Sequence, residues 1–148
     1  LSNRILVMKS GVVQQIGTPL EVYGSPANRF VFEFIGLSCF LPADLSPAGM
    51  RINGVEYPWP NGQAPSAELI ASGKGLLATR PSEINFVDEG GVRGQVTRKV
   101  YLGETIDYRV QIGEHEVRIQ KGRRTPGPDV GEAIGLAFPR AHWYAMDD

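Results

Sequence analysis

The chain has 148 residues, 42% of them hydrophobic, and its 15 lysines and arginines nearly balance its 16 acidic residues, for a net charge of −1. This composition is typical of a folded globular domain. It disfavours both a disordered segment and a nucleic-acid-binding protein that relies on a strongly basic face. No apolar run approaches the roughly 20 residues that a membrane helix needs, and a single cysteine, Cys39, leaves no partner for an internal disulfide. Because the start shows neither a methionine nor a signal peptide, we expect a cytoplasmic fragment or a processed product.

Residues 1–36 carry the pattern strand, strand, helix, helix, and we expect them to form a separate tail. Two short apolar runs flank Lys9-Ser10-Gly11, so residues 4–16 are predicted to form a β-hairpin with a three-residue loop. After Gly36 the helical signals nearly vanish and turn residues crowd in. Residues 37–148 are therefore predicted to form the second domain.

Two helix starts follow the predicted hairpin. Thr18 and Glu21 have the spacing of a capping box, with Pro19 at the first helical position. Ser25-Pro26 repeats this device and indicates a second helix, which Gly36 ends. The apolar residues that fall at helical spacing on one stripe of this helix are Phe30, Val31, Phe34 and Ile35.

Most of the 18 glycines and 11 prolines lie after the second helix, between short alternating runs. Asn53-Gly54 predicts a hairpin with a type I′ turn, because both residues tolerate positive φ angles. Residues 92–102 read as a long strand that could break at Gly94, while residues 67–71 fit either a helical turn or the start of a strand. Seven or eight such strands predict a mainly β domain: a small antiparallel barrel or sandwich, with an OB-like barrel favoured. The apolar residues that alternate on one face of the run 105–112 are Ile106, Tyr108, Val110 and Ile112.

The residues around the two helix starts resemble a known family. The run Gly11–Tyr23, followed by Pro26 and Phe30–Gly36, is similar to the end of the ATPase domain in ATP-binding subunits of ABC importers of the maltose, polyamine, sulfate and iron(III) type. In that family this segment closes the nucleotide-binding domain. It then leads into a C-terminal TOBE domain, which is an OB-like regulatory module.

The second part of the chain resembles the same family in shorter motifs. Residues 79–84 are similar to its arginine–proline turn, and residues 100–103 to its tyrosine–leucine–glycine strand end, whereas residues 37–75 match poorly. We interpret the motif residues as structural or regulatory, because capping and turn residues serve folding first. They are Thr18, Pro19, Glu21, Tyr23, Pro26, Phe30, Gly36, Arg80, Pro81, Glu83, Tyr101, Leu102 and Gly103.

The motifs that ATP hydrolysis needs are absent from the sequence. It contains no phosphate loop (Walker A), no ABC signature and no apolar strand ending in Asp-Glu (Walker B). His115, His142 and Cys39 do not have the spacing of metal ligands. We therefore expect no enzyme activity and no catalytic, cofactor or metal site in this fragment. The resemblance implies ATP and magnesium for the full-length protein.

The resemblance implies a regulatory and dimerisation domain of an ATP-binding protein that drives solute import, with iron(III) and polyamine importers favoured. The implied partners are its own ATPase domain, a second copy of the chain and membrane permease subunits, with no nucleic acid. Such a protein would lie in the cytoplasm, on the inner face of the cell membrane. If residues 4–16 belong to a sheet of the ATPase domain, we expect them to pack against another copy, pair edge to edge or be mobile.

The alternative hypothesis is a domain that senses a small anion or the transported substrate, because the TOBE fold is related to oxyanion-binding domains. Arg98, Lys99 and Arg118 are candidate anion ligands, although nothing in their spacing selects them. The basic residues within 121–124 lie between glycines and prolines. We interpret this segment as a solvated hairpin tip rather than an anion or lipid site.

Overall fold

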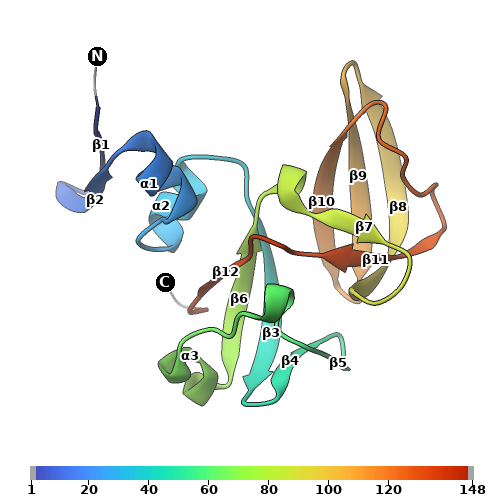
Figure 1. Cartoon of the computed structure of the whole chain (residues 1–148), viewed down its shortest axis with the longest axis horizontal. Coiled ribbons are helices and arrows are strands. Elements are labelled where there is room, and N and C mark those ends of the chain that lie inside the picture. Colours follow the sequence, from blue (N-terminus) through green and yellow to red (C-terminus); the bar gives the residue numbers. More distant parts are fainter. Residues whose placement is uncertain (1–2, 147–148) are drawn as a thin grey trace. The chain divides into compact units, whose positions relative to one another are not determined.

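The computed structural model describes residues 3–146, and the chain divides into two compact units between Ser38 and Cys39. This division lies two residues beyond Gly36, where the composition changes. Figure 1 shows the strands and helices of both units. Each α-helix described has six residues, and none in this part of the chain is long and apolar enough to cross a membrane.

The first unit opens with a hairpin of β1 (Ile5–Lys9) and β2 (Val12–Gly17). Its turn contains two residues, Ser10 with φ 51° and Gly11 with φ 79°. Positive φ at both positions is the type I′ geometry that suits the twist of a hairpin. The predicted hairpin is confirmed, but its loop is shorter than the three residues expected.

Two short helices follow, α1 (Pro19–Gly24) and α2 (Arg29–Phe34). The prediction that the second helix starts at Ser25-Pro26 was wrong. Asn28 is its N-cap, and the Asn28 side chain accepts a hydrogen bond from the backbone N–H of Val31 at 3.0 Å. Asparagine is as good a cap as serine, and in this chain Asn28, three residues after Ser25, supplies the cap.

The predicted apolar stripe of α2 is only partly buried. Val31 is fully buried against Val7 and Val22, which form a small core for this unit. Phe34 is 67% exposed, and its ring stacks on that of Phe30 at 5.7 Å between centroids. A helix of six residues presents less than two turns, so it cannot bury all four apolar side chains against a two-stranded sheet.

The second unit consists of two five-stranded antiparallel sheets. The first has the strand order β12-β6-β3-β4-β5, with β3 (Cys39–Ser46), β4 (Gly49–Ile52), β5 (Val55–Tyr57), β6 (Lys74–Thr79) and β12 (His142–Tyr144). The second has the order β10-β9-β8-β11-β7, with β7 (Asn85–Val87), β8 (Val92–Leu102), β9 (Thr105–Ile112), β10 (His115–Gly122) and β11 (Ala133–Ala137). The predicted mainly β, antiparallel fold is confirmed. Between residues 39 and 146 the strands form two open sheets and not one continuously hydrogen-bonded barrel.

Local sequence signals explain several elements of this unit. Asn53 and Gly54 join β4 to β5 with φ angles of 52° and 77°, as a type I′ turn requires. Residues 67–71, which fitted either helix or strand, lie in α3 (Ala67–Ser72), where the Ser66 side chain caps the helix by accepting from the N–H of Leu69. Two 3-10 turns complete the unit, η1 (Pro60–Gly62) and η2 (Pro81–Glu83).

The two sheets share one hydrophobic core. Alternate residues of β9 face into it, so the predicted face of that strand is confirmed as the buried one. Burial of each large apolar side chain stabilises the fold by about 1.5–3 kcal/mol. The largest fully buried side chains of the core are those of Leu41, Ile52, Leu77, Ile84, Tyr108, Ile112, Ile119 and Leu136.

The irregular point of β8 is Thr97 and not Gly94, where a break was expected. Gly94 pairs regularly with Ile134, whereas the pairing with β9 shifts by one residue between Val96 and Arg98. This β-bulge reverses the faces of the strand beyond it. Without the bulge Arg98 would follow Val96 into the core. With it, Arg98 lies on the outer face.

Gly94 is needed for space rather than for a turn. A Cβ at this position would lie 2.6 Å from Val110 Cγ1 and 2.9 Å from the carbonyl oxygen of Gln111. We predict that Gly94→Ala lowers the free energy of unfolding by about 1–3 kcal/mol through overpacking. Urea denaturation measures this loss. Gly122→Ala is the matched control, because a Cβ there meets only Thr125 Oγ1 at 3.6 Å, so equal losses in both variants would contradict the packing explanation.

Candidate functional site

The outer face of β8, β9 and β10 carries a row of three arginines. Arg109 of β9 lies directly opposite Arg98 of β8 on one side and Arg118 of β10 on the other. Residues directly opposite each other in antiparallel strands project from the same face of the sheet. We refer to Arg98, Arg109 and Arg118 as the arginine row.

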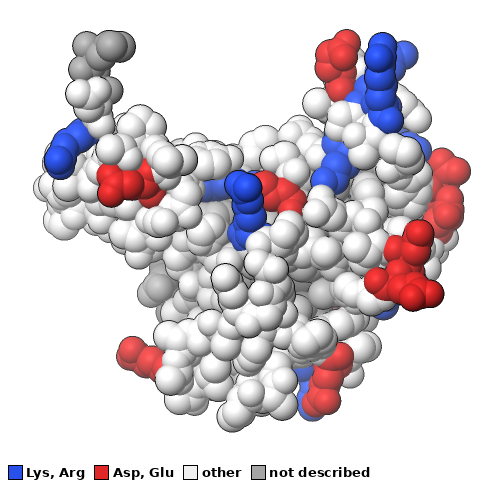
Figure 2. Space-filling view, in the orientation of Figure 1, with Lys and Arg blue, Asp and Glu red and all other residues white. Residues whose placement is uncertain are grey.

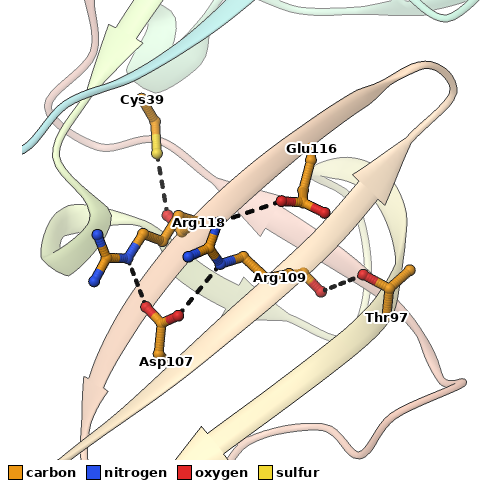
Figure 3. A network of polar contacts seen from close by, with 6 residues as sticks. All are labelled: Cys39, Thr97, Asp107, Arg109, Glu116 and Arg118. Atoms are coloured by element: carbon orange, nitrogen blue, oxygen red, sulfur yellow. Dashed lines mark hydrogen bonds and ion pairs between the residues drawn. The ribbon is translucent and has the colours of Figure 1, made fainter.

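One buried carboxylate holds two members of the row (Figure 3). Asp107 accepts from the Nε of Arg118 at 2.7 Å and from the Nε of Arg109 at 3.2 Å. A second acid, Glu116, accepts from Nη1 of Arg109 at 3.3 Å. The Asp107 side chain is 8% exposed, whereas both arginine side chains are 32% exposed. The carboxylate therefore lies beneath the guanidinium groups, which cover it.

The titration of Asp107 reflects two opposing effects. Burial disfavours the charged carboxylate and acts to raise its pKa. Hydrogen bonds and charge from Arg118 and Arg109 outweigh burial and leave the pKa of Asp107 below its ordinary value. Asp107 is therefore ionised at neutral pH and balances the charge of the two arginines.

Two further hydrogen bonds fix the backbone beneath the row. The Thr97 hydroxyl, at the bulge of β8, donates to the carbonyl oxygen of Arg109 at 3.3 Å. The Cys39 thiol, at the start of β3, donates to the carbonyl oxygen of Arg118 at 3.2 Å. Burial raises the pKa of the Cys39 thiol, so Cys39 is an uncharged donor. The row is thereby tied to both sheets of the second unit.

Among the predicted anion ligands, Arg98 and Arg118 lie on one row and Lys99 does not join them. Lys99 pairs opposite Tyr108 on the other face, where its Nζ lies 5.5 Å from the centre of the Tyr108 ring and 3.3 Å from Asp129 Oδ1. The bulge decides which of the two joins the row, because it places Arg98 and Lys99 on the faces opposite to those that simple alternation gives.

Sequence reasoning missed Asp107, Arg109 and Glu116. The alternation within residues 105–112 already places Asp107 and Arg109 together, on the face opposite the apolar residues. The polar side of this alternation is thus the sequence signal that identifies Asp107 and Arg109 as a pair. The pairing of β9 with β10, which brings in Arg118 and Glu116, also follows from the short turn between them.

The capping-box residues of the first unit lie where the sequence predicts. Thr18 Oγ1 accepts from the N–H of Glu21 at 3.2 Å, and Glu21 Oε1 accepts from the N–H of Thr18 at 2.9 Å, with Pro19 at the first helical position. These hydrogen bonds lower the pKa of Glu21. Tyr23 and Pro26 lie in α1 and just after it, at the surface. The capping interactions are structural, and they do not converge on a site.

Phe30 lies in the first turn of α2, and Gly36 lies two residues after its end. The Phe30 ring packs partly on the small core of the first unit, and Lys9 Nζ lies 5.2 Å from its centre. The helix ends at Phe34 with Ile35 as its C-cap, so Gly36 follows the helix rather than capping it.

The arginine–proline motif lies where β6 ends. Arg80 and Pro81 are buried at the start of η2, and the N–H of Glu83 donates to the carbonyl oxygen of Arg80 at 2.9 Å. Arg140 forms an ion pair with Glu83 at 3.5 Å. These contacts shape the strand exit.

The tyrosine–leucine–glycine motif forms the tip between β8 and β9. Tyr101 and Leu102 end β8 with exposed side chains, and Gly103 adopts φ 67° in the turn. The segment 121–124 lies beside this tip, because Gly122 pairs with Thr105. Lys121 Nζ donates to Asn85 Oδ1 at 3.0 Å, and burial lowers the pKa of Lys121, so only part of that segment is a solvated tip.

Other candidate chemistry is not assembled in the described residues. Within residues 3–146 no three histidine, cysteine, aspartate or glutamate side chains gather as a metal site would require, so His115, His142 and Cys39 form none. Figure 2 shows basic and acidic side chains interspersed over the face in view, in keeping with the near-neutral net charge. The arginine row with Asp107 is thus the most strongly organised polar cluster that the geometry reveals.

Comparison with known proteins defines the class of this domain. Residues 77–146, which run from the second half of β6 through β12 and include the whole arginine row, match the TOBE domain family. This part of the chain belongs to that family, as its motifs at residues 79–84 and 100–103 predict.

The relatives are ATP-binding subunits of importers. The chain is 34% identical over 95% of its length to the spermidine/putrescine import ATP-binding protein PotA of Pseudomonas fluorescens. It is 31% identical over 99% of its length to the Fe(3+) ions import ATP-binding protein FbpC of Escherichia coli. Both alignments cover 40% of the relative. The resemblance to this family is confirmed, and the chain spans about 40% of the length of these curated relatives.

The buried carboxylate gives a direct test of the network. We predict that Asp107→Asn lowers the free energy of unfolding by about 2 kcal/mol at neutral pH, because two opposed arginines lose their shared counter-charge. This is less than the roughly 3–5 kcal/mol for fully buried pairs, since both guanidinium groups are partly exposed. Because the folded-state pKa of Asp107 is lowered, its contribution is present above the unfolded value of about 3.9 and is lost as the pH falls through the folded value.

Urea denaturation of both proteins at neutral pH and at about pH 3 measures this difference. Glu114→Gln, in the exposed turn after β9, is the matched control for removing one negative charge. A cost of Asp107→Asn that stays constant across this pH range, or equals that of Glu114→Gln, would contradict the charge-balance role.

Proposed function

We propose that this chain is the C-terminal regulatory part of the ATP-binding subunit of an ABC importer. The observation that carries the proposal is the pattern of the alignments: nearly the whole chain matches importer ATP-binding proteins, but it spans only 40% of their length. The absence of a phosphate loop and an ABC signature from the sequence supports the assignment of ATP and magnesium to the remaining part of such a protein.

The exposed apolar surface of the first unit supports the proposal that a further domain covers it. Its hairpin buries Val7 and Gly17, but six apolar side chains are between 38% and 61% exposed. A two-stranded sheet is marginally stable by itself in water, and exposed apolar strands favour association. We propose that the ATPase domain of the same protein covers this surface. The exposed residues are Ile5, Leu6, Met8, Val12, Val13 and Ile16.

We propose that the second unit regulates transport by pairing with another copy, so that it holds two ATPase domains together as they open and close. The complex would act through permease subunits on the cytoplasmic face of the cell membrane. Polyamines and iron(III) are the proposed substrates, because the relatives' names specify import of spermidine and putrescine or of Fe(3+) ions.

ATP hydrolysis tests the central part of this proposal. We predict no magnesium-dependent ATP hydrolysis by the chain alone, and measurable hydrolysis by the protein made from a coding sequence that includes the region upstream of residue 1. Phosphate release measures both. Hydrolysis by the chain alone, or an upstream region without a phosphate loop and ABC signature, would overturn the proposal.

Self-association tests the pairing separately. We predict that sedimentation velocity of the chain shows a dimer that becomes more populated as the concentration rises through the micromolar range, because specific interfaces bury about 800 Å² per partner. The same measurement on the longer protein serves as the comparison. If both the chain and the longer protein stay monomeric, the pairing proposal is wrong, and the ATPase assignment is unaffected.

A further inference from the structure

The arginine row places like charges side by side at a cost to folding. Adjacent strands lie about 4.8 Å apart, so the backbone positions of Arg98 and Arg118 are separated by about 10 Å across β9. Like charges directly opposite each other in a sheet are destabilising. Asp107 and Glu116 reduce this repulsion, but both bind Arg109, and neither binds Arg98. The row therefore keeps an excess of positive charge.

The acids leave the outward-facing donors of the row unused. Arg118 contacts Asp107 through Nε alone, and Figure 3 shows its two Nη atoms pointing away from that carboxylate. Arg109 uses Nε and Nη1, and its Nη2 makes no hydrogen bond. Within residues 3–146 the Arg98 side chain has no hydrogen bond or ion pair, and it is exposed. Each guanidinium thus presents N–H groups in the planar arrangement that binds carboxylates.

The shape of the row favours an extended ligand over a small one. A single small oxyanion reaches one or two guanidinium groups on an open sheet face, whereas a segment with several carboxylates reaches all three. The positions that flank the row hold Gln95 and Gln111, which face each other on the same side of the sheet. Tyr101 pairs opposite Ile106 and so belongs to the other face. This face therefore lacks the aromatic platform that single-stranded nucleic acid needs.

We propose that the arginine row is a docking surface for a carboxylate-rich segment of a partner protein. Asp107 fixes Arg109 and Arg118 from beneath, so little side-chain entropy is lost when their free Nη groups bind. Arg98 adds a third, exposed guanidinium at the edge of the surface. The charge of the row complements glutamate and aspartate side chains. The Nε2 atoms of Gln95 and Gln111 already donate to backbone carbonyl oxygens of this chain, and their side-chain oxygens can accept from the backbone of an extended segment.

A rhodamine-labelled octaglutamate peptide tests this surface by fluorescence anisotropy with the intact chain at low salt. We expect saturable binding that weakens as salt is added. We also expect Arg98→Gln to weaken it about tenfold, because a hydrogen bond to a charged group contributes about 1.5–3 kcal/mol. Between residues 3 and 146 the Arg98 side chain has no hydrogen bond or ion pair to lose, so this variant should keep the wild-type urea midpoint. Arg124→Gln is the matched control, since it removes the same charge from an exposed loop position.

Each outcome bears on the proposal. Binding that Arg98→Gln weakens and Arg124→Gln leaves unchanged supports it. Equal weakening by both variants shows attraction to net charge alone and overturns it, as does the absence of binding. Competition by inorganic phosphate as effective as that by unlabelled peptide assigns the row to a small oxyanion, and tighter binding of an oligothymidylate assigns it to nucleic acid. Either result also overturns the proposal.

Discussion

The carboxylate of Asp107 is the constraint on which the outer face of the second sheet depends. It lies beneath Arg109 and Arg118 and binds the Nε of both, so two side chains that repel each other across neighbouring strands share one counter-charge. The thiol of Cys39 then joins the backbone of Arg118 to the other sheet. A single buried acid thus engages the Nε of both arginines, and Glu116 engages only Nη1 of Arg109.

The bulge at Thr97 supplies the third arginine. Strand alternation has a period of two, so an extra residue transfers every later side chain to the opposite face. Arg98 therefore lies on the outer face, in the row. Lys99 lies on the core face, over Tyr108, and pairs with Asp129. One irregularity in the backbone therefore decides which of two neighbouring cations joins the row.

Short-range patterns predicted the parts of this chain that short-range forces determine. The capping box of Thr18 and Glu21 and the turn at Asn53-Gly54 form as expected, because each depends on atoms within three or four residues. The predicted start of α2 was wrong, because Asn28 and not Ser25 caps this helix and both residue types are good caps. The arrangement in two open sheets and the bulge at Thr97 depend on partners distant in the sequence, which no local pattern reveals.

The distinction between what a sequence shows directly and what strand pairing adds applies to charge as well. A net charge of −1 excludes a function that needs a long basic face, and it sets no limit on a local surface of a few aligned cations. In this domain the compensating acids do not cancel the row uniformly: Asp107 is buried beneath it, Glu116 lies at one edge, and Arg98 has no acid beside it. A partner therefore binds guanidinium groups that are aligned across three strands, and strand register rather than composition determines this alignment.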